Sequence, residues 1–261
     1  MGFLNRKKIL IVGALNKKSI AYGAAEALHN QGADLAFTYQ THSLKYRLER
    51  ITVHFSNCPL IKCDVSCDED IDNVFTVLSD NWGHLDGIVH SIAYAPADQL
   101  RGDFISSINR EGFSIAHNIS AYSFAAFAKY GRKLMQNRSA SLVTLTYLGA
   151  EFAMPNYNTM GPAKASLESV VRYTAFSLGP SGIRANAVSA GPILTASAAG
   201  IRDFKKILDY NEQASPLKRN VTLEQIGNTV AFLISDLSSG ITGEVVHVDS
   251  GYHASRMVGL N

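Results

Sequence analysis

Short apolar runs alternate with longer amphipathic segments along the whole chain of 261 residues. Runs such as Lys8–Gly13, Asp34–Tyr39 and Arg184–Ala190 are apolar enough to be buried on both sides of a sheet. Such alternation predicts a parallel sheet covered by helices on both faces, because parallel strands are connected through helical crossovers. We therefore expect an α/β fold, built as one Rossmann-type, doubly wound, seven-stranded parallel sheet.

The element boundaries follow from where the periodicity changes. The predicted strands are Lys8–Gly13, Asp34–Tyr39, Pro59–Lys62, Leu85–His90, Leu142–Thr146, Arg184–Ala190 and Glu244–Val248. The predicted helices are Ser19–Asn30, Ser43–Phe55, Glu69–Asn81, Glu111–Gln136, Tyr157–Leu178 and Leu223–Ser235. No linker or internal repeat interrupts this pattern, so residues 1–261 are expected to form a single dinucleotide-binding and catalytic domain.

One segment breaks the alternation. Ile193–Pro216 is too long for an ordinary connection between a strand and a helix, and long segments of this kind are often active-site lids. We expect a helical, substrate-binding lid at about residues 193–216.

The composition argues against several classes of protein. The formal net charge is only +2 and the charges are interspersed, so no basic stripe for nucleic acid is present. No apolar run approaches the roughly 18 residues that a membrane span needs. The N-terminus enters the first predicted strand without an apolar signal region, and Arg6 stands where a myristoylation motif would have Ser or Thr. We expect a cytoplasmic protein.

The cysteines do not form a metal-binding pattern. Cys58, Cys63 and Cys67 fall close together, but a fourth ligand at matching spacing is missing. Reduced structural thiols are therefore expected, and no metal site is predicted.

A possible phosphate-binding turn follows the first predicted strand. Gly13 at the strand end would let the backbone approach a pyrophosphate, and Ser19 can cap a helix whose N-terminus favours an anion. The spacing departs from the usual Gly-x-Gly-x-x-Gly form, so the motif alone leaves a simple tight turn as the alternative.

Tyr147, Tyr157 and Lys164 carry the most specific chemical signal. Seven residues on an α-helix make about two turns, which would place Tyr157 and Lys164 on one face roughly 10 Å apart along the axis. A Lys side chain leans toward the helix N-terminus, and a cation near a phenol lowers the pKa of that phenol. Taken alone, a surface Lys and a half-buried Tyr are the structural alternative. Tyr147 strengthens the catalytic interpretation, because it ends a predicted strand at the sheet edge where ligands bind.

This arrangement resembles the short-chain dehydrogenase/reductase family, whose usual signature is Tyr-x-x-x-Lys with an upstream Ser or Thr. Here Gly161 occupies the usual Lys position. Tyr-x6-Lys with a second Tyr ten residues upstream is similar to the branch of NADH-dependent enoyl-acyl-carrier-protein reductases. The resemblance extends along nearly the whole chain and includes His90–Leu100 and Gly191–Thr195.

The resemblance implies an NADH/NAD⁺ site. Gln40 would lie at the adenosine end, where NAD-selective sites usually carry an acidic residue, and Lys45 and Arg47 nearby leave NADPH open on physical grounds. Asp64 would accept from the adenine amino group, with helix capping as its structural alternative, although Ser66 or Asp68 fits that position better. The remaining implied cofactor-binding residues are Gly13, Ser19, Ile20, Val65, Ser91, Ile92, Ala93, Lys164, Ile193, Leu194, Thr195, Ala196 and Ser197.

The same resemblance implies reduction of a trans-2-enoyl thioester, the last reductive step of type II fatty acid elongation. Negative charge develops on the thioester oxygen as hydride adds, so a hydrogen-bond donor must be placed there. Tyr157 is the candidate donor and Lys164 would hold the nicotinamide ribose. Tyr147 would shape the pocket or relay a proton, and Ala95 would also contact substrate. Asn118 is either a water-ordering residue or an ordinary helix-surface Asn.

The lid and the helix faces predict partners. Arg202, Lys205 and Lys206 would share one face of a helix and either remain solvated or dock an acidic acyl carrier protein. The helices Glu111–Gln136 and Tyr157–Leu178 carry more apolar residues than one core-facing stripe needs. With the resemblance, this predicts a homotetramer.

Two rival functions remain. A carbonyl reductase, such as a ketoacyl reductase, would need an upstream hydroxyl, and Thr144 could provide it. A non-catalytic dinucleotide-sensing protein could have the same fold, but retention of both Tyr157 and Lys164 favours catalysis.

Overall fold

The computed structural model describes residues 2–55, 57–195 and 204–255. The strands are β1 (Lys8–Val12), β2 (Asp34–Tyr39), β3 (Leu60–Lys62), β4 (Gly87–His90), β5 (Ser141–Thr146), β6 (Arg184–Ala190) and β7 (Val245–Val248). The α-helices are α1 (Ile20–Asn30), α2 (His42–Thr52), α3 (Asp68–Trp82), α4 (Phe104–Ser107), α5 (Arg110–His117), α6 (Ser123–Met135), α7 (Met160–Leu178), α8 (Phe204–Ala214) and α9 (Leu223–Ile234). A π-helical segment, Asn118–Tyr122, joins α5 to α6, and single 3₁₀ turns include η3 (Leu148–Ala150) and η7 (Tyr252–Ala254).

The seven strands of the described chain form one sheet in the order β3-β2-β1-β4-β5-β6-β7, and every neighbouring pair is parallel. The predicted doubly wound, seven-stranded parallel sheet is therefore confirmed. β1 pairs with β2 on one side and with β4 on the other, so the direction of winding reverses between β1 and β4. In folds of this kind ligands bind beyond the carboxyl ends of the strands at that point.

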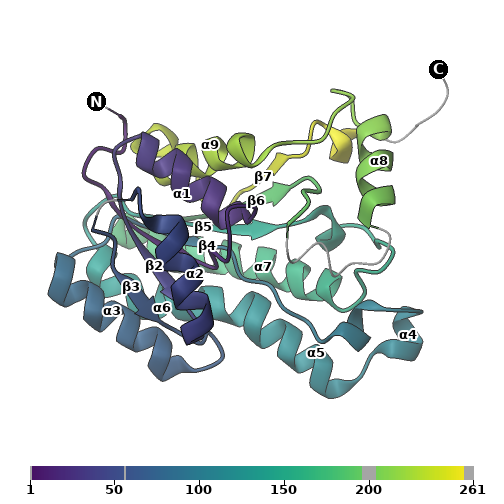
Figure 1. Cartoon of the computed structure of the whole chain (residues 1–261), viewed down its shortest axis with the longest axis horizontal. Coiled ribbons are helices and arrows are strands. Elements are labelled where there is room, and N and C mark those ends of the chain that lie inside the picture. Colours follow the sequence, from purple (N-terminus) through teal and green to yellow (C-terminus); the bar gives the residue numbers. More distant parts are fainter. Residues whose placement is uncertain (1, 56, 196–203, 256–261) are drawn as a thin grey trace.

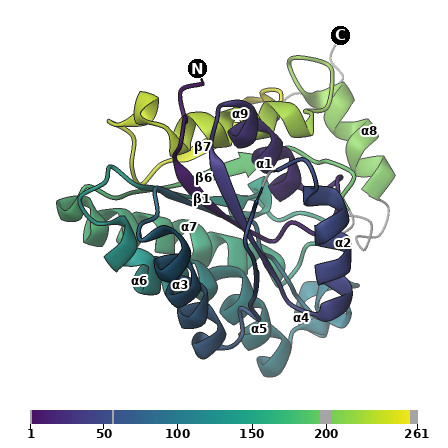
Figure 2. The same ribbon diagram turned by 60° about the vertical axis from the view of Figure 1, so that its left-hand side comes forward.

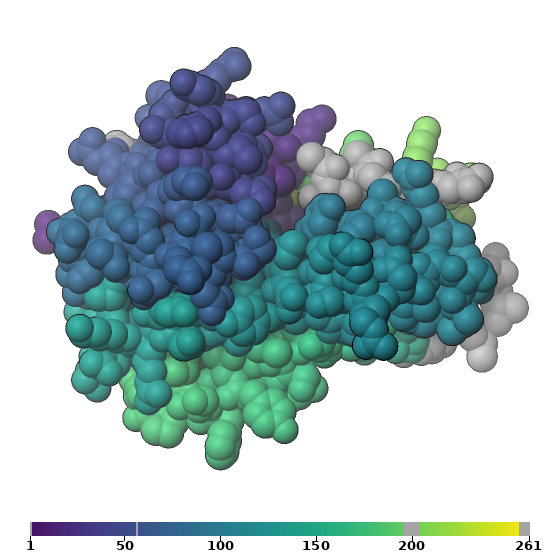
Figure 3. All heavy atoms as spheres, turned by 90° about the horizontal axis from the view of Figure 1, so that it is seen from below, coloured from purple at the N-terminus to yellow at the C-terminus, as the bar shows by residue number. Residues whose placement is uncertain are grey.

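Each face of the sheet has its own apolar core. In β1, Ile9 and Ile11 point to the cluster under α1, α2 and α9, whereas Leu10 and Val12 point to the cluster under α3, α6 and α7. Figures 1 and 2 show these two helical layers on opposite sides of the sheet. Figure 3 views the second layer from outside, as adjoining blue, teal and green bands from the middle of the chain. The alternation of side chains along a strand thus fills two cores from one apolar run.

Helices α1 and α9 contact each other closely at two glycines, Gly23 and Gly227. A Cβ built on Gly227 would lie 2.4 Å from the carbonyl oxygen of Gly23, and a Cβ on Gly23 would lie 2.9 Å from Cβ of Leu223. No side chain fits at either position, so the backbones of α1 and α9 approach closely. This contact holds α1, whose N-terminus points toward the ligand edge, against the sheet.

One predicted helix is interrupted in the structure. The segment predicted as one helix, Glu111–Gln136, contains the π-helical turn, in which an extra residue bulges from the i→i+4 ladder. The helical lid was predicted at about residues 193–216; α8, Phe204–Ala214, lies within this range, and residues 196–203 lie outside the described part.

Within the described ranges, Cys58, Cys63 and Cys67 are unpaired thiols, as predicted, and no group of three or more His, Cys, Asp or Glu residues is arranged to hold a metal ion. None of the helices that the structure describes is long and apolar enough to cross a membrane.

Candidate active site

The ends of β1 and β4 meet at the edge where ligands are expected. Gly13 has a φ of +100°, and a Cβ at this position would lie 2.2 Å from the carbonyl oxygen of Ser91. The amide of Ser91 donates to the carbonyl of Val12 at 2.9 Å. Only glycine satisfies both the backbone conformation and the space at position 13. The result is a tight turn, called the cradle here, in which Gly13 packs against the backbone of Ser91 and the side chain of Ile92.

The N-terminus of α1 opens toward this cradle. The Ser19 hydroxyl accepts from the amide of Tyr22 at 3.3 Å and donates to the carbonyl of Asn16 at 2.7 Å, so the predicted N-cap is confirmed. Ile20 is the first residue of the helix. The unpaired amides and the dipole of a helix N-terminus favour an anion.

Gln40 and Asp64 lie together at the ends of β2 and β3. The Gln40 side-chain amide donates to the carboxylate of Asp64 at 2.9 Å, and the amide and hydroxyl of Ser66 donate to the same carboxylate. The hydrogen bond from the Ser66 hydroxyl, followed by those from Gln40 and the Ser66 amide, holds the pKa of Asp64 below its usual value. The next residue, Val65, is half-buried and packs against the apolar cluster under α3, α6 and α7. A negative charge therefore stands beside Gln40.

The capping expectation for the next helix was wrong. The N-cap of α3 is Cys67, whose side chain makes no capping hydrogen bond, rather than Ser66 or Asp68. Three acidic residues in the first turn compensate, and one of them, Asp70, accepts from the amide of Asp64 at 2.8 Å. The carboxylate of Asp64 therefore does not cap α3.

The π-helical turn supports the loop that follows β4. The Ser120 hydroxyl accepts from the amide of Tyr94 at 3.0 Å and donates to the carbonyl of the same residue at 3.2 Å. The loop thus presents Ser91, Ile92 and Ala93 beside the cradle, while Ala95 is buried. Sequence analysis missed Ser120, because the bulge that aims it at Tyr94 has no clear sequence signal.

Asn118 opens the same turn but points elsewhere. Its side chain is exposed, and its amide donates to the Ser114 hydroxyl at 3.4 Å. This places it on the helix surface, the alternative that the sequence left open. On the other side of the crevice, Ile193 is half-buried, Leu194 is 56% exposed, and the amide of Thr195 donates to the carbonyl of Ile193 at 2.8 Å. Three further predicted site residues lie outside the described residues, namely Ala196, Ser197 and Arg202.

Tyr157 does not belong to the helix that carries Lys164, contrary to the prediction. Asn156 and Asn158 have φ angles of +59° and +34°, so the chain turns around Tyr157, and α7 begins only at Met160. Pro162 was the signal that sequence analysis missed. Proline lacks an amide proton and is tolerated in the first helical turn, where no internal partner exists, but not further inside.

Two missing side chains make room for the Tyr157 ring. A Cβ on Gly149 would lie 2.5 Å from that ring, and a Cβ on Gly161 would lie 2.9 Å from the carbonyl oxygen of Gly149. The ring therefore lies against the turn η3, edge-on to Tyr147 with 5.2 Å between ring centroids. Gly161, which replaces the usual Lys of the wider family, has no space for any side chain.

Lys164 reaches the same edge from α7. Its ammonium is buried and donates to the carbonyl of Leu145 at 2.8 Å, and burial lowers its pKa to about 8. Burial, with smaller contributions from Tyr147 and Glu168, raises the pKa of Tyr157 far above its usual value, and burial raises that of Tyr147 to about 12. The expected lowering of the Tyr157 pKa was therefore wrong. A phenol that keeps its proton is, however, a hydrogen-bond donor throughout the neutral range.

The upstream hydroxyls are both engaged. Thr144 is fully buried and lies 3.0 Å from Nδ1 of His90, and its hydroxyl also donates to the carbonyl of His90 at 3.1 Å. Thr146 donates to the carboxylate of Glu168 at 2.7 Å. Neither hydroxyl is directed at the space in front of Tyr157. Burial lowers the pKa of His90 to about 3, so this imidazole is neutral.

A cavity of about 370 Å³ opens beside Tyr147. It is lined on one side by Met154–Asn156 and on the other by α8, through Lys206, Ile207, Tyr210 and Asn211, with Tyr252 closing the end. The neighbouring Lys205 is exposed but does not line it. The space has the size and mixed lining of a small-molecule site.

The comparisons with known proteins agree with this arrangement. The family model described as enoyl-(acyl carrier protein) reductase matches residues 13–253. The enoyl-acyl-carrier-protein reductase (NADH) of Escherichia coli strain K12 is 54% identical over 257 residues, which cover 98% of each chain. The crystal structure of the corresponding reductase from Aquifex aeolicus has a TM-score of 0.95 at 48% identity and covers 98% of this chain and 100% of that one. A reductase from Anaplasma phagocytophilum in complex with NAD has a TM-score of 0.93 at 41% identity, covering 100% and 96%. This chain therefore belongs to the enoyl-acyl-carrier-protein reductase family.

Proposed function

We propose that the protein reduces the trans-2 double bond of enoyl thioesters on acyl carrier protein, with NADH as the hydride donor, in the last reductive step of each fatty acid elongation cycle. The observation that carries this proposal is the contact between Tyr147 and Tyr157 beside the buried ammonium of Lys164. The family and the 54% identical reductase support it.

The cofactor site would run along the carboxyl edge of the sheet. Gly13 and the N-terminus of α1 would hold the pyrophosphate, and Gln40 with Asp64 would hold the adenosine end. Gln40 carries no charge, but the ionised carboxylate of Asp64 lies beside it. This negative charge would repel the 2′-phosphate of NADPH. Lys45 is paired with Glu49 at 3.7 Å, so this cation is already engaged. The site therefore favours NADH over NADPH.

NADH, when bound, would supply the hydride for the β-carbon of the thioester, and a proton from Tyr157, Tyr147 or water would complete the reduction at the α-carbon. Tyr157 donates a hydrogen bond to the thioester oxygen, where negative charge develops during the reaction. Its raised pKa keeps the donor proton in place before the reaction. Lys164 would hold the nicotinamide ribose hydroxyls, and Tyr147 and Ala95 would border the enoyl group. Ile193, Leu194 and Thr195 would close over the nicotinamide end.

A ketoacyl reductase would use an upstream hydroxyl beside the catalytic Tyr. Both candidates are engaged elsewhere, Thr144 with His90 and Thr146 with Glu168. This favours reduction of a carbon–carbon double bond over that of a ketone. The retained Tyr157 and Lys164 also favour catalysis over dinucleotide sensing alone.

The segment of residues 193–216 would act as the substrate lid of a single catalytic domain. Lys205 and Lys206 are exposed in the first turn of α8, and Lys206 borders the cavity beside Tyr147. Together with Arg202 they would dock the acidic surface of the carrier protein, so that the thioester enters beside α8. We also propose a cytoplasmic location, supported by the three unpaired cysteines.

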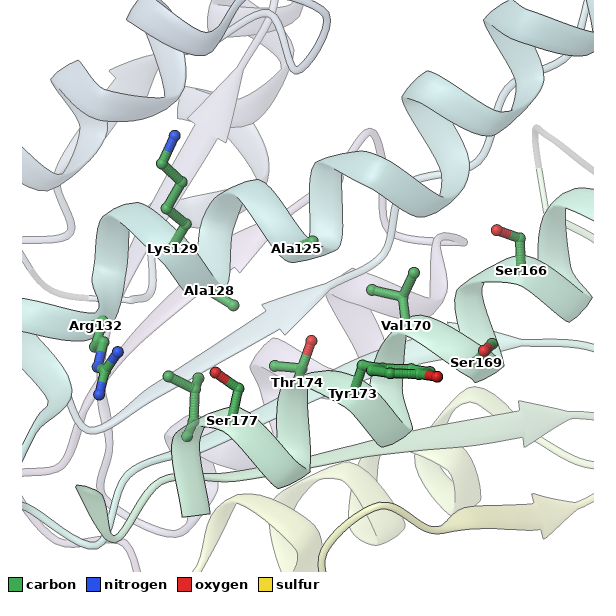
Figure 4. Close-up of a pocket in the computed structure, with 11 residues that line it drawn as sticks. Ala125, Ala128, Lys129, Arg132, Ser166, Ser169, Val170, Tyr173, Thr174 and Ser177 are labelled. Carbon is green, nitrogen blue, oxygen red and sulfur yellow. The ribbon is translucent and has the colours of Figure 1, made fainter. Parts of the chain in front are cut away.

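A groove between α6 and α7 supports the proposed homotetramer. It has a volume of about 570 Å³, and Figure 4 shows its lining residues on two facing helices, with Ala125 and Ala128 on α6 and Val170 and Thr174 on α7. Tyr173 and Phe176 on α7 are 77% and 85% exposed in the single chain. A second copy related by two-fold symmetry would cover these aromatic rings and bring four helices together.

The reaction itself can be tested with two matched thioesters. We expect NADH oxidation with a trans-2-enoyl thioester and much slower oxidation with the 3-ketoacyl thioester of the same chain length. NADPH should support the enoyl reaction less well than NADH. Absorbance of the reduced cofactor reports all three rates. Turnover of the ketoacyl substrate without the enoyl one would contradict the proposed reaction.

Two substitutions should separate catalysis from cofactor binding. Tyr157→Phe should lower kcat by about 100-fold or more, since it removes a donor used mainly in the transition state, and should leave NADH affinity nearly unchanged. Lys164→Ala should instead weaken NADH binding by about tenfold or more, because a charged hydrogen-bond donor is lost. Fluorescence titration of NADH and steady-state rates measure the two effects. Unchanged NADH affinity in the Lys164 variant would refute this division.

Charge reversal on α8 should affect mainly the carrier-bound substrate. Changing both Lys205→Glu and Lys206→Glu should raise the KM for an enoyl-acyl-carrier-protein by about fivefold, with less effect on a short coenzyme A thioester. The effect should shrink as salt rises, because exposed charges act mainly on encounter. Lys133→Glu on α6 is the matched control and should change neither KM. An equal loss with both substrates would assign the two lysines to lid stability instead.

The assembly can be tested by light scattering at micromolar concentration, where we expect the mass of a tetramer. Phe176→Glu should shift the protein toward smaller species, because a charge would be buried in the proposed interface. Val53→Glu, which changes an equally exposed apolar residue outside α6 and α7, should leave the mass unchanged. A monomer mass for the unmodified protein would rule the proposal out.

A further inference from the structure

A buried carboxylate lies one helical turn from the Lys164 ammonium. Glu168 is only 8% exposed, and both residues belong to α7 with the i,i+4 spacing that places side chains on the same face. Buried carboxylates are rare, because removing the charge from water costs free energy unless a partner compensates. The proposed reaction, as described above, does not use Glu168.

The two side chains dock onto consecutive residues of β5. Lys164 donates to the carbonyl of Leu145 at 2.8 Å, and Glu168 accepts from the hydroxyl of Thr146 at 2.7 Å. Both contacts are buried, and Tyr147 follows directly in the chain. Lys164 and Glu168 therefore hold α7 against the end of β5, directly before Tyr147.

Other ionisable groups face the pair from neighbouring elements. Next to Lys164 is His90 on β4, which burial keeps neutral, and Tyr157, before α7, interacts with Glu168. Around Glu168 they are Arg172 on α7, Glu151 after η3 and His247 on β7. Glu151 and His247 are 3.0 Å apart and pair with each other at the surface. Glu168 is thus the acidic side chain that acts on Lys164.

We propose that Glu168 is a positioning residue, the buried counter-charge that keeps Lys164 in its cationic, ribose-binding form in the working pH range of the enzyme. Burial lowers the pKa of Lys164, and the negative charge of Glu168 opposes this fall, so that the pKa is about 8. Burial raises the pKa of Glu168 above its usual value, and the hydrogen bond from Thr146 opposes this rise and favours the ionised carboxylate. This proposal rests on the proposed role of Lys164 in binding NADH.

The direction of the pH effect follows from these signs. Lys164 binds the ribose as a cation, so NADH affinity should decline as the pH rises through the pKa of Lys164. Removing the negative charge of Glu168 lowers that pKa further, because a cation loses its nearest opposite charge. The alkaline limb of NADH binding should therefore move to lower pH in a variant without the carboxylate.

The test is NADH affinity, measured by fluorescence titration from pH 6 to 9.5 (a range chosen to bracket the pKa of about 8 for Lys164). Glu168→Gln should shift the alkaline limb down by about half a pH unit or more. Glu168→Asp, which keeps the charge, should restore most of the unmodified profile. Glu151→Gln removes a negative charge from a residue that does not act on Lys164. This variant should not move the alkaline limb of NADH binding to lower pH.

The outcomes separate the two proposals. An unmodified protein that binds no NADH at any pH would overturn the proposed function. Normal binding with superimposable profiles for Glu168→Gln and the unmodified protein, or an equal downward shift in Glu151→Gln, would overturn the role of Glu168 alone. If Glu168→Gln does not fold, Thr146→Val decides, because losing its hydrogen bond disfavours the ionised carboxylate and should shift the limb in the same direction by less.

Discussion

The site depends on one close backbone approach, between the turn after β5 and the start of α7. Gly149 and Gly161 meet there without side chains, and the ring of Tyr157 lies in the space that a Cβ would occupy. This contact brings Tyr157 edge-on to Tyr147 and lets α7 begin at Met160. Lys164 then reaches back to the strand end from the second turn of the helix. The spacing of the Tyr and Lys in this branch is a consequence of that packing.

Burial sets the electrostatics of the same region. It keeps the protons on Tyr147 and Tyr157 and weakens the hold of Lys164 on its own proton. These effects oppose the simple picture of a cation that ionises a neighbouring phenol. The phenols therefore keep their protons as hydrogen-bond donors, and in our proposal the carboxylate of Glu168 controls the charge state of Lys164. The tyrosines and the lysine thus have separate tasks within one buried cluster.

The sequence was most informative where local pattern and tertiary packing coincide. β2 and β6 have the predicted bounds, and both strands are buried over most of their length, as expected for strands covered on both faces. The start of α7 was misplaced because the apolar periodicity continues through Tyr157, although Asn156, Asn158 and Pro162 signal a turn there. The hydrogen bond between Thr146 and Glu168 joins residues from a strand and a helix, and spacing along the chain does not reveal such a contact. Periodicity therefore gave the architecture, whereas the partners of buried polar groups required the three-dimensional structure.

The engagement of both upstream threonines has a consequence for protein engineering. A ketone-reducing variant of this scaffold would need a free hydroxyl near Tyr157, so Thr144 would have to be released from His90, which is itself locked between β4 and α6 by the Ser123 hydroxyl. Moving the lysine to the usual family position is blocked at Gly161 by the Gly149 carbonyl. Changing enoyl reduction into ketone reduction would therefore require coupled changes in the backbone and in the core. Single substitutions made one at a time would give poorly packed intermediate proteins.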